Sequence, residues 1–538
     1  MLRSMGRMAA FSRRGWVMGA AVALGLAFTA PAGAQQGKTL KWGAAREIAS
    51  LDPYSFGDTF TLATLNHVYE GLVRYTGELG IEPALAESWE TVSPTVWRFK
   101  LRSGVNFHNG EAFTADDVVA SLERVTHESS PLKGNLPAYK SSRKIDDRTV
   151  EIEVNGPYPL LLNDLTNIFI MSKGWMEKNN ALMPTDSGKG IKGYATDNAN
   201  GTGPFMVESR RPDAKTVFVV NPKWWDKPQH NLARIEFTPI ASAATRVAAM
   251  LSGEIDFTNV APLQDLPRLS AAPGVKVMQS SELRTVYFAM NLGNTLPGSD
   301  IKDRNPLKDA RVREALYRAI DIDAVHRRAM RGLSRNTGAV VAPAIPGYTP
   351  EMDVRLPFDA DGAKKLLAAA GYPNGFGFTL NCVSDGLVNE EEFCQAVAAM
   401  WTRVGLKVNL DLAPRSQQTP KRVKGDFDVI SFGWANEPMI DAYSILIQVV
   451  RSKSGSGGVF NWGDWGRADM DALIDKAGVE LDRPKRIAMM SEALMILKRE
   501  NLFIPLHQQP MAWAIRGNVA TMVQASDNKP RLWLTKMN

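Results

Sequence analysis

The sequence predicts an α/β fold in which helices cover mixed sheets, in a chain too long for one hydrophobic core. Residues 97–101 and 150–154 each alternate apolar with charged side chains, as half-buried strands do. Between them, Thr114 and Asp117 form a capping box that begins a helix. Helix and strand patterns follow one another again over 393–412. Single cores stop growing at about 250–300 residues, so the 538 residues predict two or more lobes.

Each predicted element follows from the period of its apolar residues. Apolar side chains at every second position indicate a strand, and spacings of three and four indicate one face of a helix. Gly405 ends the later helix. The periodic residues, element by element, are Trp97, Phe99 and Leu101; Val118, Leu122 and Val125; Val150, Ile152 and Val154; Phe393, Val397, Met400, Trp401 and Val404; and Leu406, Val408, Leu410 and Leu412.

The first 34 residues are interpreted as a removable export signal. Four arginines precede an uncharged stretch over 15–29, and residues 32–34 give the small-x-small pattern that a signal peptidase accepts. A membrane anchor would need about 20 strongly apolar residues, which this stretch does not have. Residues 12–17 also resemble a twin-arginine signal, so the export route stays open. Because no cysteine lies near the expected cleavage at Ala34, we expect a free periplasmic protein.

The charge of the chain is mostly a property of this signal. The whole sequence carries +6, and the four arginines of residues 1–34 leave about +2 on the remainder. No cluster of Lys and Arg with interleaved aromatic residues suggests nucleic-acid binding. A hydrophobic content of 44% and a charged content of 22% are ordinary for a globular chain, so disorder is not indicated.

The two cysteines, Cys382 and Cys394, both follow the export signal. An oxidising compartment favours their pairing as a disulfide that closes a small loop. Two buried free thiols or a metal pair are the alternatives. A metal site would need further Cys or His nearby, and no others lie between residues 327 and 506. We therefore expect a disulfide and no metal.

A series of short motifs is spread in order over nearly the whole chain after the signal. They are Leu51-Asp52-Pro53-Tyr54, Tyr69-Glu70-Gly71-Leu72-Val73, residues 83–89, Phe107-His108-Asn109-Gly110, residues 114–119, Thr202-Gly203-Pro204-Phe205, residues 221–225, 252–256, 309–316 and 363–372. Together they resemble the extracellular solute-binding proteins, family 5, which deliver dipeptides, oligopeptides and some non-peptide solutes to ABC importers. The resemblance implies a protein that binds a solute and delivers it to a transporter, not an enzyme.

The family implies a bilobal periplasmic-binding-protein fold with two crossing segments and an extra subdomain inserted in the first lobe. Carried onto this sequence, residues 37–80, 203–285 and 506–538 form the first lobe. Residues 81–202 form the inserted subdomain, and residues 286–505 form the second lobe. The ligand would be enclosed between the lobes and would stabilise a closed state that the transporter recognises.

Two segments are candidates for the ligand cleft, and the first is an extended segment over Gly57, Asp58 and Thr59. The spacing from Leu51 to Glu70 matches peptide-binding relatives and places this segment where the family pairs its backbone with an extended ligand. Backbone pairing suits a receptor for many peptides, because every peptide offers the same N–H and C=O groups. An ordinary solvated loop is the alternative.

The second candidate segment, residues 431–438, resembles the family's Gly-Trp segment. There an acid three residues after the Trp pairs with the α-amino group of the ligand, and here that residue is Glu437. The family has Asp, and the extra methylene of Glu leaves the anchoring geometry open. An enclosed ammonium needs a carboxylate partner, and losing one member of such a pair can cost roughly 2–5 kcal/mol. The other candidates in this segment are Gly433, Trp434, Ala435 and Asn436.

Two side chains in this region have competing interpretations. Trp434 either stacks on the ligand or forms a wall of the cleft. Asp441 is a second acid near Glu437, with capping of the following helix as its alternative role. In dipeptide-binding relatives an Arg just before the helix at 390–404 meets the ligand carboxylate, but residues 382–386 offer no Arg. This argues against a dipeptide held at both termini and leaves a longer peptide, or a cationic or neutral solute, open.

Enzyme motifs are absent from the sequence. Its six histidines are scattered, with no His-Glu-x-x-His pair, no P-loop and no nucleophile elbow. His108 lies in a turn motif and is interpreted as a structural histidine. We therefore expect a periplasmic peptide-binding protein of an ABC importer, monomeric, without a cofactor or catalytic residues, whose partners are its solute and an inner-membrane permease. An opine, a nickel chelate or a sugar is the alternative solute, and a periplasmic hydrolase is a remote alternative.

Overall fold

The structure is a computed structural model that describes residues 37–538 except 385, 438 and 455–456. The predicted export signal lies outside these residues. None of the described helices combines the length and the apolar character needed to cross a bilayer.

The described chain alternates strands and helices, as predicted. The strands are Lys38–Ala44 (β1), Val73–Tyr75 (β2), Ile81–Pro83 (β3), Ala86–Ser93 (β4), Val96–Leu101 (β5), Tyr139–Asp146 (β6), Thr149–Val154 (β7), Phe205–Arg211 (β8), Lys215–Val220 (β9), Leu232–Pro239 (β10), Phe257–Thr258 (β11), Val275–Met290 (β12), Arg335–Asn336 (β13), Gly377–Val383 (β14), Lys407–Ala413 (β15), Val429–Trp434 (β16), Phe503–Arg516 (β17), Val519–Thr521 (β18) and Lys536–Met537 (β19). The α-helices are Thr59–Leu65 (α1), Ala115–Thr126 (α2), Leu161–Leu165 (α3), Lys173–Lys178 (α4), Tyr194–Asp197 (α5), Ala243–Ser252 (α6), Leu266–Ser270 (α7), Ala310–Arg318 (α8), Ile322–Ala324 (α9), Ala360–Ala369 (α10), Glu390–Arg403 (α11), Arg415–Val423 (α12), Tyr443–Ile445 (α13), Ala468–Val479 (α14) and Arg483–Arg499 (α15).

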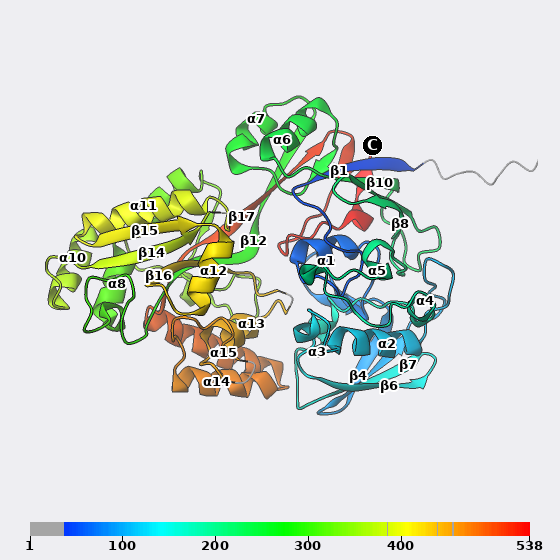
Figure 1. Cartoon of the computed structure of the whole chain (residues 1–538), viewed down its shortest axis with the longest axis horizontal. Coiled ribbons are helices and arrows are strands. Elements are labelled where there is room, and N and C mark those ends of the chain that lie inside the picture. Colours follow the sequence, from blue (N-terminus) through cyan, green and yellow to red (C-terminus); the bar gives the residue numbers. More distant parts are fainter. Residues whose placement is uncertain (1–36, 385, 438, 455–456) are drawn as a thin grey trace, which may run out of the picture. The chain divides into compact units, whose positions relative to one another are not determined.

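One large mixed sheet runs through the described chain in the order β15-β14-β16-β12-β17-β11-β1-β10-β9-β8, and β13 also pairs with β17. Its middle is the antiparallel pair β12 and β17, which lie side by side in Figure 1. Beyond β17 lie β1 and the strands from residues 205–258, and beyond β12 lie the strands from residues 377–434. The bilobal α/β class with mixed sheets is confirmed. The predicted lobe boundaries at residues 285–286 and 505–506 fall within β12 and β17.

A smaller, separate antiparallel sheet, β4-β5-β7-β6, lies within residues 81–202, the range predicted for the inserted subdomain. The two strands predicted from alternation, β5 and β7, pair so that Trp97 faces Ile152 and Phe99 faces Val150. Helix α2 begins at the predicted capping box, in which the Asp117 carboxylate accepts the Thr114 N–H at 2.8 Å. These elements are therefore confirmed. The exact lobe boundaries stay a prediction.

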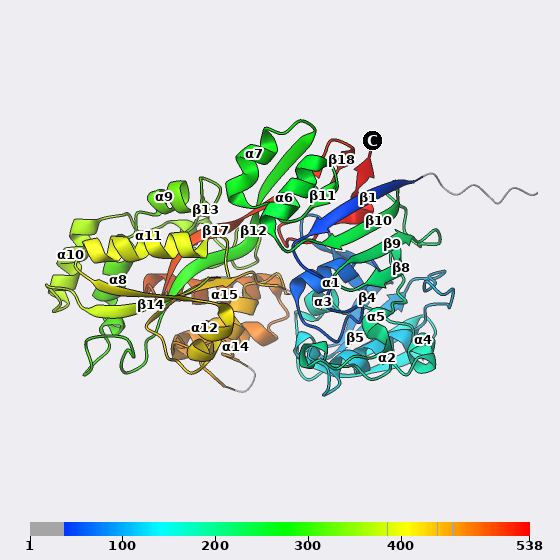
Figure 2. The ribbon, with the colours of Figure 1, turned by 45° about the horizontal axis from the view of Figure 1, so that its top comes forward.

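The second-lobe sheet has a core on each of its faces. Along β12, Phe288 packs into the cluster that contains Trp401 of α11, whereas Tyr287 packs into the cluster that contains Trp465 and Leu494. This alternation is the period of two that a strand buried on both faces imposes. Figure 2 shows α11 lying along this sheet, with α14 and α15 grouped together elsewhere on the lobe.

A buried ion pair joins the Leu51-Asp52-Pro53 motif to helix α2. Both guanidinium nitrogens of Arg124 donate to the Asp52 carboxylate, at 2.7 and 2.6 Å, and both side chains are almost fully buried. The two residues are 72 positions apart. This pair therefore fixes the inserted subdomain to the start of the first lobe.

Three other motifs meet at one buried carboxylate, that of Glu70. It accepts hydrogen bonds from Thr202 Oγ1 at 2.8 Å, Trp225 Nε1 at 2.8 Å and Trp224 Nε1 at 3.1 Å. Close to it, a Cβ at Gly201 would lie 2.0 Å from the Val68 carbonyl oxygen, so only glycine fits there. These motif residues hold the first lobe together.

His108 is a structural histidine, as predicted. Its Nε2 is 3.0 Å from the Gly203 carbonyl oxygen, and its Nδ1 accepts the Gly201 N–H at 3.3 Å. Burial lowers the pKa of His108 to about 4, so the ring is neutral at pH 7.

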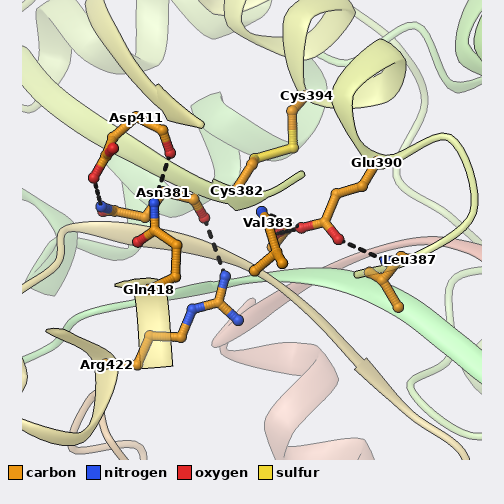
Figure 3. The surroundings of a disulfide bond; sticks show 10 residues. Asn381, Cys382, Val383, Leu387, Glu390, Cys394, Asp411, Gln418 and Arg422 are labelled. Atoms are coloured by element: carbon orange, nitrogen blue, oxygen red, sulfur yellow. Dashed lines mark hydrogen bonds between the residues drawn. A yellow bond between two sulfur atoms is a disulfide. The ribbon is translucent and has the colours of Figure 1, made fainter. Parts of the chain in front are cut away.

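The disulfide between Cys382 and Cys394 is confirmed (Figure 3). It joins the end of β14 to the second turn of α11, across 12 positions of sequence, and both cysteines are fully buried. Beside it, the Glu390 carboxylate accepts the N–H groups of Val383 and Leu387, each at 2.7 Å. The sulfurs and this carboxylate form a cluster with metal-ligand composition, but the sulfurs are bonded to each other and are not free thiolates.

We predict that Asp52→Ala lowers the free energy of unfolding by about 3–5 kcal/mol, because it leaves the Arg124 charge buried without a partner. Urea denaturation at pH 7 measures this loss. The control is Asp116→Ala, which removes a solvent-exposed ion pair with Lys144 and should leave the midpoint nearly unchanged. Equal effects of the two substitutions would contradict the structural role of the Asp52–Arg124 pair.

We also predict that replacing both cysteines with serine lowers the free energy of unfolding by about 3 kcal/mol, since the disulfide closes a short loop in the unfolded chain. Urea denaturation of the oxidised protein and the double variant gives the difference. Reducing agent should destabilise the native protein and leave the variant unaffected. A double variant as stable as the native protein would refute this expectation.

Candidate ligand-binding site

Residues 57–59 and Glu437 line one cavity, whereas the other predicted ligand-binding residues, Gly433, Trp434, Ala435, Asn436 and Asp441, do not line it. Its volume is about 140 Å³, below the range of about 300–1,000 Å³ usual for sites that bind drug-sized molecules. Gly57, Asp58 and Thr59 lie on one side of it, and Glu437 comes from the distant Gly-Trp segment. The remaining lining residues are Leu62, Leu132, Asn135, Asn167 and Lys529.

The 57–59 segment lies at a helix N-terminus. Gly57 and Asp58 precede α1, and the Asp58 carboxylate caps it by accepting the Phe60 N–H at 3.0 Å. Asp58 also lies 3.6 Å from the Arg46 guanidinium. The predicted extended segment through Thr59 is wrong at its end, because Thr59 is the first residue of α1. The correction has a local cause: an aspartate followed by a helix-compatible run is a strong N-cap.

The first part of the Gly-Trp segment lies in β16, where Gly433 and Trp434 pair with β12. A Cβ at Gly433 would lie 2.8 Å from a Leu387 methyl carbon and 3.3 Å from Arg284 Cδ, so a larger residue would displace these two side chains. Trp434 Nε1 donates to Ser444 Oγ at 3.1 Å. The Trp434 ring also contacts Phe432 and Phe460, and Trp434 is not among the residues that line the cavity.

Beyond β16, the chain turns sharply at Asn436. This residue has a left-handed backbone with φ of 58°, and its carbonyl oxygen accepts the Ile440 N–H at 2.7 Å. Its side chain is 1% exposed, and neither amide atom has a hydrogen-bond partner among the described residues. Ala435, just before it, is half-buried and does not line the cavity. The turn directs the next side chain, that of Glu437, into the cavity.

Glu437 is the unpaired acid of the cavity. Its half-buried side chain forms no hydrogen bond or ion pair within the described part of the chain. Burial raises the pKa of Glu437 from 4.5 to about 7; Lys529 opposes the rise, and Asp527 and Glu282 add to it. A carboxyl group with this pKa is ready to ionise when a cation enters.

Asp441, the second acid near Glu437, has a structural partner. Its two carboxylate oxygens accept from the Arg486 guanidinium at 2.7 and 2.9 Å, and one of them also accepts the Tyr443 N–H at 2.9 Å. Both charged side chains are buried. These contacts favour the capping interpretation over a direct ligand role for Asp441.

The turn that carries Glu437 is fixed to the first lobe. The Met439 carbonyl oxygen accepts from Tyr75 Oη at 3.0 Å and from Asn163 Nδ2 at 2.5 Å. The Met439 side chain packs in the first-lobe core. Glu437 is thereby held opposite residues 57–59.

Three further polar residues line the cavity that the sequence does not predict: the cation Lys529 and the amides Asn135 and Asn167. Each comes from a segment without a recognised motif. The only signal was the charged run Asp527, Lys529 and Arg531 near the end of the chain. Such a run is usually solvent-exposed, and only the structure shows that these three side chains are buried.

Comparison with known proteins identifies relatives over most of the chain. The glutathione-binding protein GsiB of Escherichia coli K12 is 28% identical over 88% of this chain and 89% of its own length. The heme-binding protein A of Haemophilus influenzae is 27% identical over 85% of each chain.

Solved structures share the fold. HbpA2 from Haemophilus parasuis superposes with a TM-score of 0.80 at 24% identity, over 93% of this chain and 100% of that one. The periplasmic binding protein DppA from Helicobacter pylori, in complex with peptide STSA, gives a TM-score of 0.73 at 23% identity, over 93% and 98%. The model of the bacterial extracellular solute-binding proteins, family 5, matches residues 80–457. This chain therefore belongs to the bacterial extracellular solute-binding proteins, family 5.

Proposed function

We propose that this protein captures peptides between its two lobes and delivers them to an ABC permease in the inner membrane. The observation that carries the proposal is the unpaired, partly buried carboxyl group of Glu437, which lines a cavity shared with residues 57–59. A peptide offers the ammonium that this carboxylate lacks and the backbone groups that residues 57–59 can meet. The glutathione-binding relative and the peptide-bound structural neighbour support a peptide.

The proposal includes a cellular location and a division of the chain. Residues 1–34 would direct export to the periplasm and be removed near Ala34. Residues 37–80, 203–285 and 506–538 would form the first lobe, 81–202 its inserted subdomain, and 286–505 the second lobe. The protein would act as a monomer and would release its ligand chemically unchanged.

Mass spectrometry of the solute released from gently purified protein is the first test of this function. Co-purified peptides would support it, as would a thermal shift caused by peptides but not by their N-acetylated forms. Stabilisation only by heme, an opine, a sugar or a nickel chelate would keep the role in solute capture and contradict the peptide assignment. Hydrolysis of an added peptide would contradict the binding-only role.

We predict that the affinity for an amine-bearing peptide rises with pH up to about 7 and then levels off. The bound ammonium needs the ionised form of Glu437, whose pKa in the free protein is about 7. Each pH unit below 7 should weaken binding about tenfold. Calorimetry at pH 5.5, 6.5 and 7.5 measures this slope. Glu437→Gln should bind weakly and show no slope, and a slope that survives this substitution would exclude Glu437 as the anchor.

A second prediction concerns the stability of the ligand-free protein. The folded pKa of Glu437, about 7, lies above its ordinary value of 4.5, so its contribution to stability is full below pH 4.5 and is lost as the pH rises to about 7. Glu437→Gln removes this loss. Its thermal midpoint should therefore match the native protein at pH 4.5 and exceed it by a few degrees at pH 8. A difference independent of pH would show that burial of Glu437 is not the cause.

A further inference from the structure

The cavity contains a cation that the proposed peptide anchor does not use. Lys529 lies in the C-terminal segment after β18 and is only 6% exposed. It lines the candidate cavity and also a smaller cavity next to it. Its Nζ donates to Asn167 Oδ1 at 3.4 Å, longer than the roughly 2.7–2.9 Å of a strong charged hydrogen bond. An ammonium group can donate three hydrogen bonds, and the long contact with Asn167 is the one hydrogen bond that Lys529 Nζ forms in the described structure.

The neighbouring carboxylates have other partners. Asp527 accepts from both terminal nitrogens of Arg531, at 2.7 and 3.3 Å, and accepts the backbone N–H of Lys529 at 3.1 Å. Asp58 caps α1 and lies beside Arg46. Among the described residues, no carboxylate forms an ion pair with Lys529 Nζ. A buried ammonium without an anion is costly, and such a residue in a cavity marks a place where a ligand supplies the missing charge.

Lys529 and Glu437 line the same cavity and carry opposite charges. They are close enough for the field of Lys529 to oppose the rise in the pKa of Glu437, yet they form no ion pair with each other in the described structure. A ligand that filled this cavity could therefore place a negative group against Lys529 and a positive group against Glu437 at the same time. The amide groups of Asn135 and Asn167 also line it and can donate to a carboxylate.

We propose that Glu437 and Lys529 together bind a zwitterionic α-amino-acid head, in which the ammonium and a free carboxylate sit on the same carbon. An ordinary peptide does not offer this head, because the carboxyl group next to its amino terminus is tied up in a peptide bond. A peptide linked through the side chain of its first residue, such as a γ-glutamyl peptide, does offer it. The inference rests on the proposed function and narrows its solute class.

Two isomeric dipeptides separate these possibilities: γ-glutamyl-alanine and α-glutamyl-alanine. They have the same composition and net charge, and they differ in whether a free carboxylate shares the carbon that bears the ammonium. Calorimetry at pH 7.5 should show the γ isomer binding at least about tenfold more tightly to the native protein. Lys529→Met should reduce this preference to less than about threefold, and Lys529→Arg should retain most of it.

The matched control is Lys365→Met, which removes an exposed lysine from α10 and should keep the native preference. Circular dichroism confirms that each variant is folded. If Lys529→Met does not fold, Lys529→Gln replaces it, and the preference of the native protein is measured without any variant. Equal binding of the two isomers overturns the head-group proposal and leaves peptide capture standing. A preference that survives in Lys529→Met or Lys529→Gln excludes Lys529. Failure to bind either isomer overturns the head-group proposal, and the mass spectrometry of co-purified solute decides peptide capture separately.

Discussion

The antiparallel pairing of β12 with β17 is the contact on which the arrangement of the two lobes depends. The register runs from Val275 opposite Arg516 to Ala289 opposite Phe503, so strands of both lobes join one sheet through these two strands. The ladder is interrupted between Ser281 and Thr285. This irregular point places Arg284 against Gly433, at the start of the Gly-Trp segment. The connection between the lobes and the segment that carries Glu437 are thus built from the same strands.

Most of the motifs that identify the family are structural joints of the first lobe. Asp52 pairs with Arg124, and Glu70 receives hydrogen bonds from Thr202, Trp224 and Trp225. Buried polar groups of this kind must all be satisfied, because each unpaired group costs free energy in a low-dielectric interior. Their residue types are therefore tightly restricted by the fold. This explains why the family can be recognised from them while the ligand cannot.

The candidate cavity has the opposite character. Glu437 and Lys529 line it with few partners, and both amide atoms of the neighbouring Asn436 are buried without a hydrogen bond in the described structure. Such groups lower the stability of the ligand-free protein, as is common for sites preorganised to bind. Asp441, only four residues after Glu437, is fully paired with Arg486 and shows the contrast. The number of hydrogen-bond and ion-pair partners distinguishes the structural acid, Asp441, from the candidate anchor, Glu437. Their positions in the sequence, only four residues apart, do not.

The sequence by itself determined the fold class, the strands at 97–101 and 150–154, the capped helix at Thr114 and the Cys382–Cys394 pairing. Each of these depends on local periodicity, a short-range cap or the compartment, which neighbouring residues already specify. The sequence also named Glu437 and residues 57–59, by resemblance. Only the tertiary structure decided that these segments share one cavity, that Asp441 is paired, and that Lys529 is buried beside Glu437. Those facts depend on contacts between residues as far apart in the sequence as 57, 437 and 529. A local sequence pattern does not predict which distant side chains will contact one another.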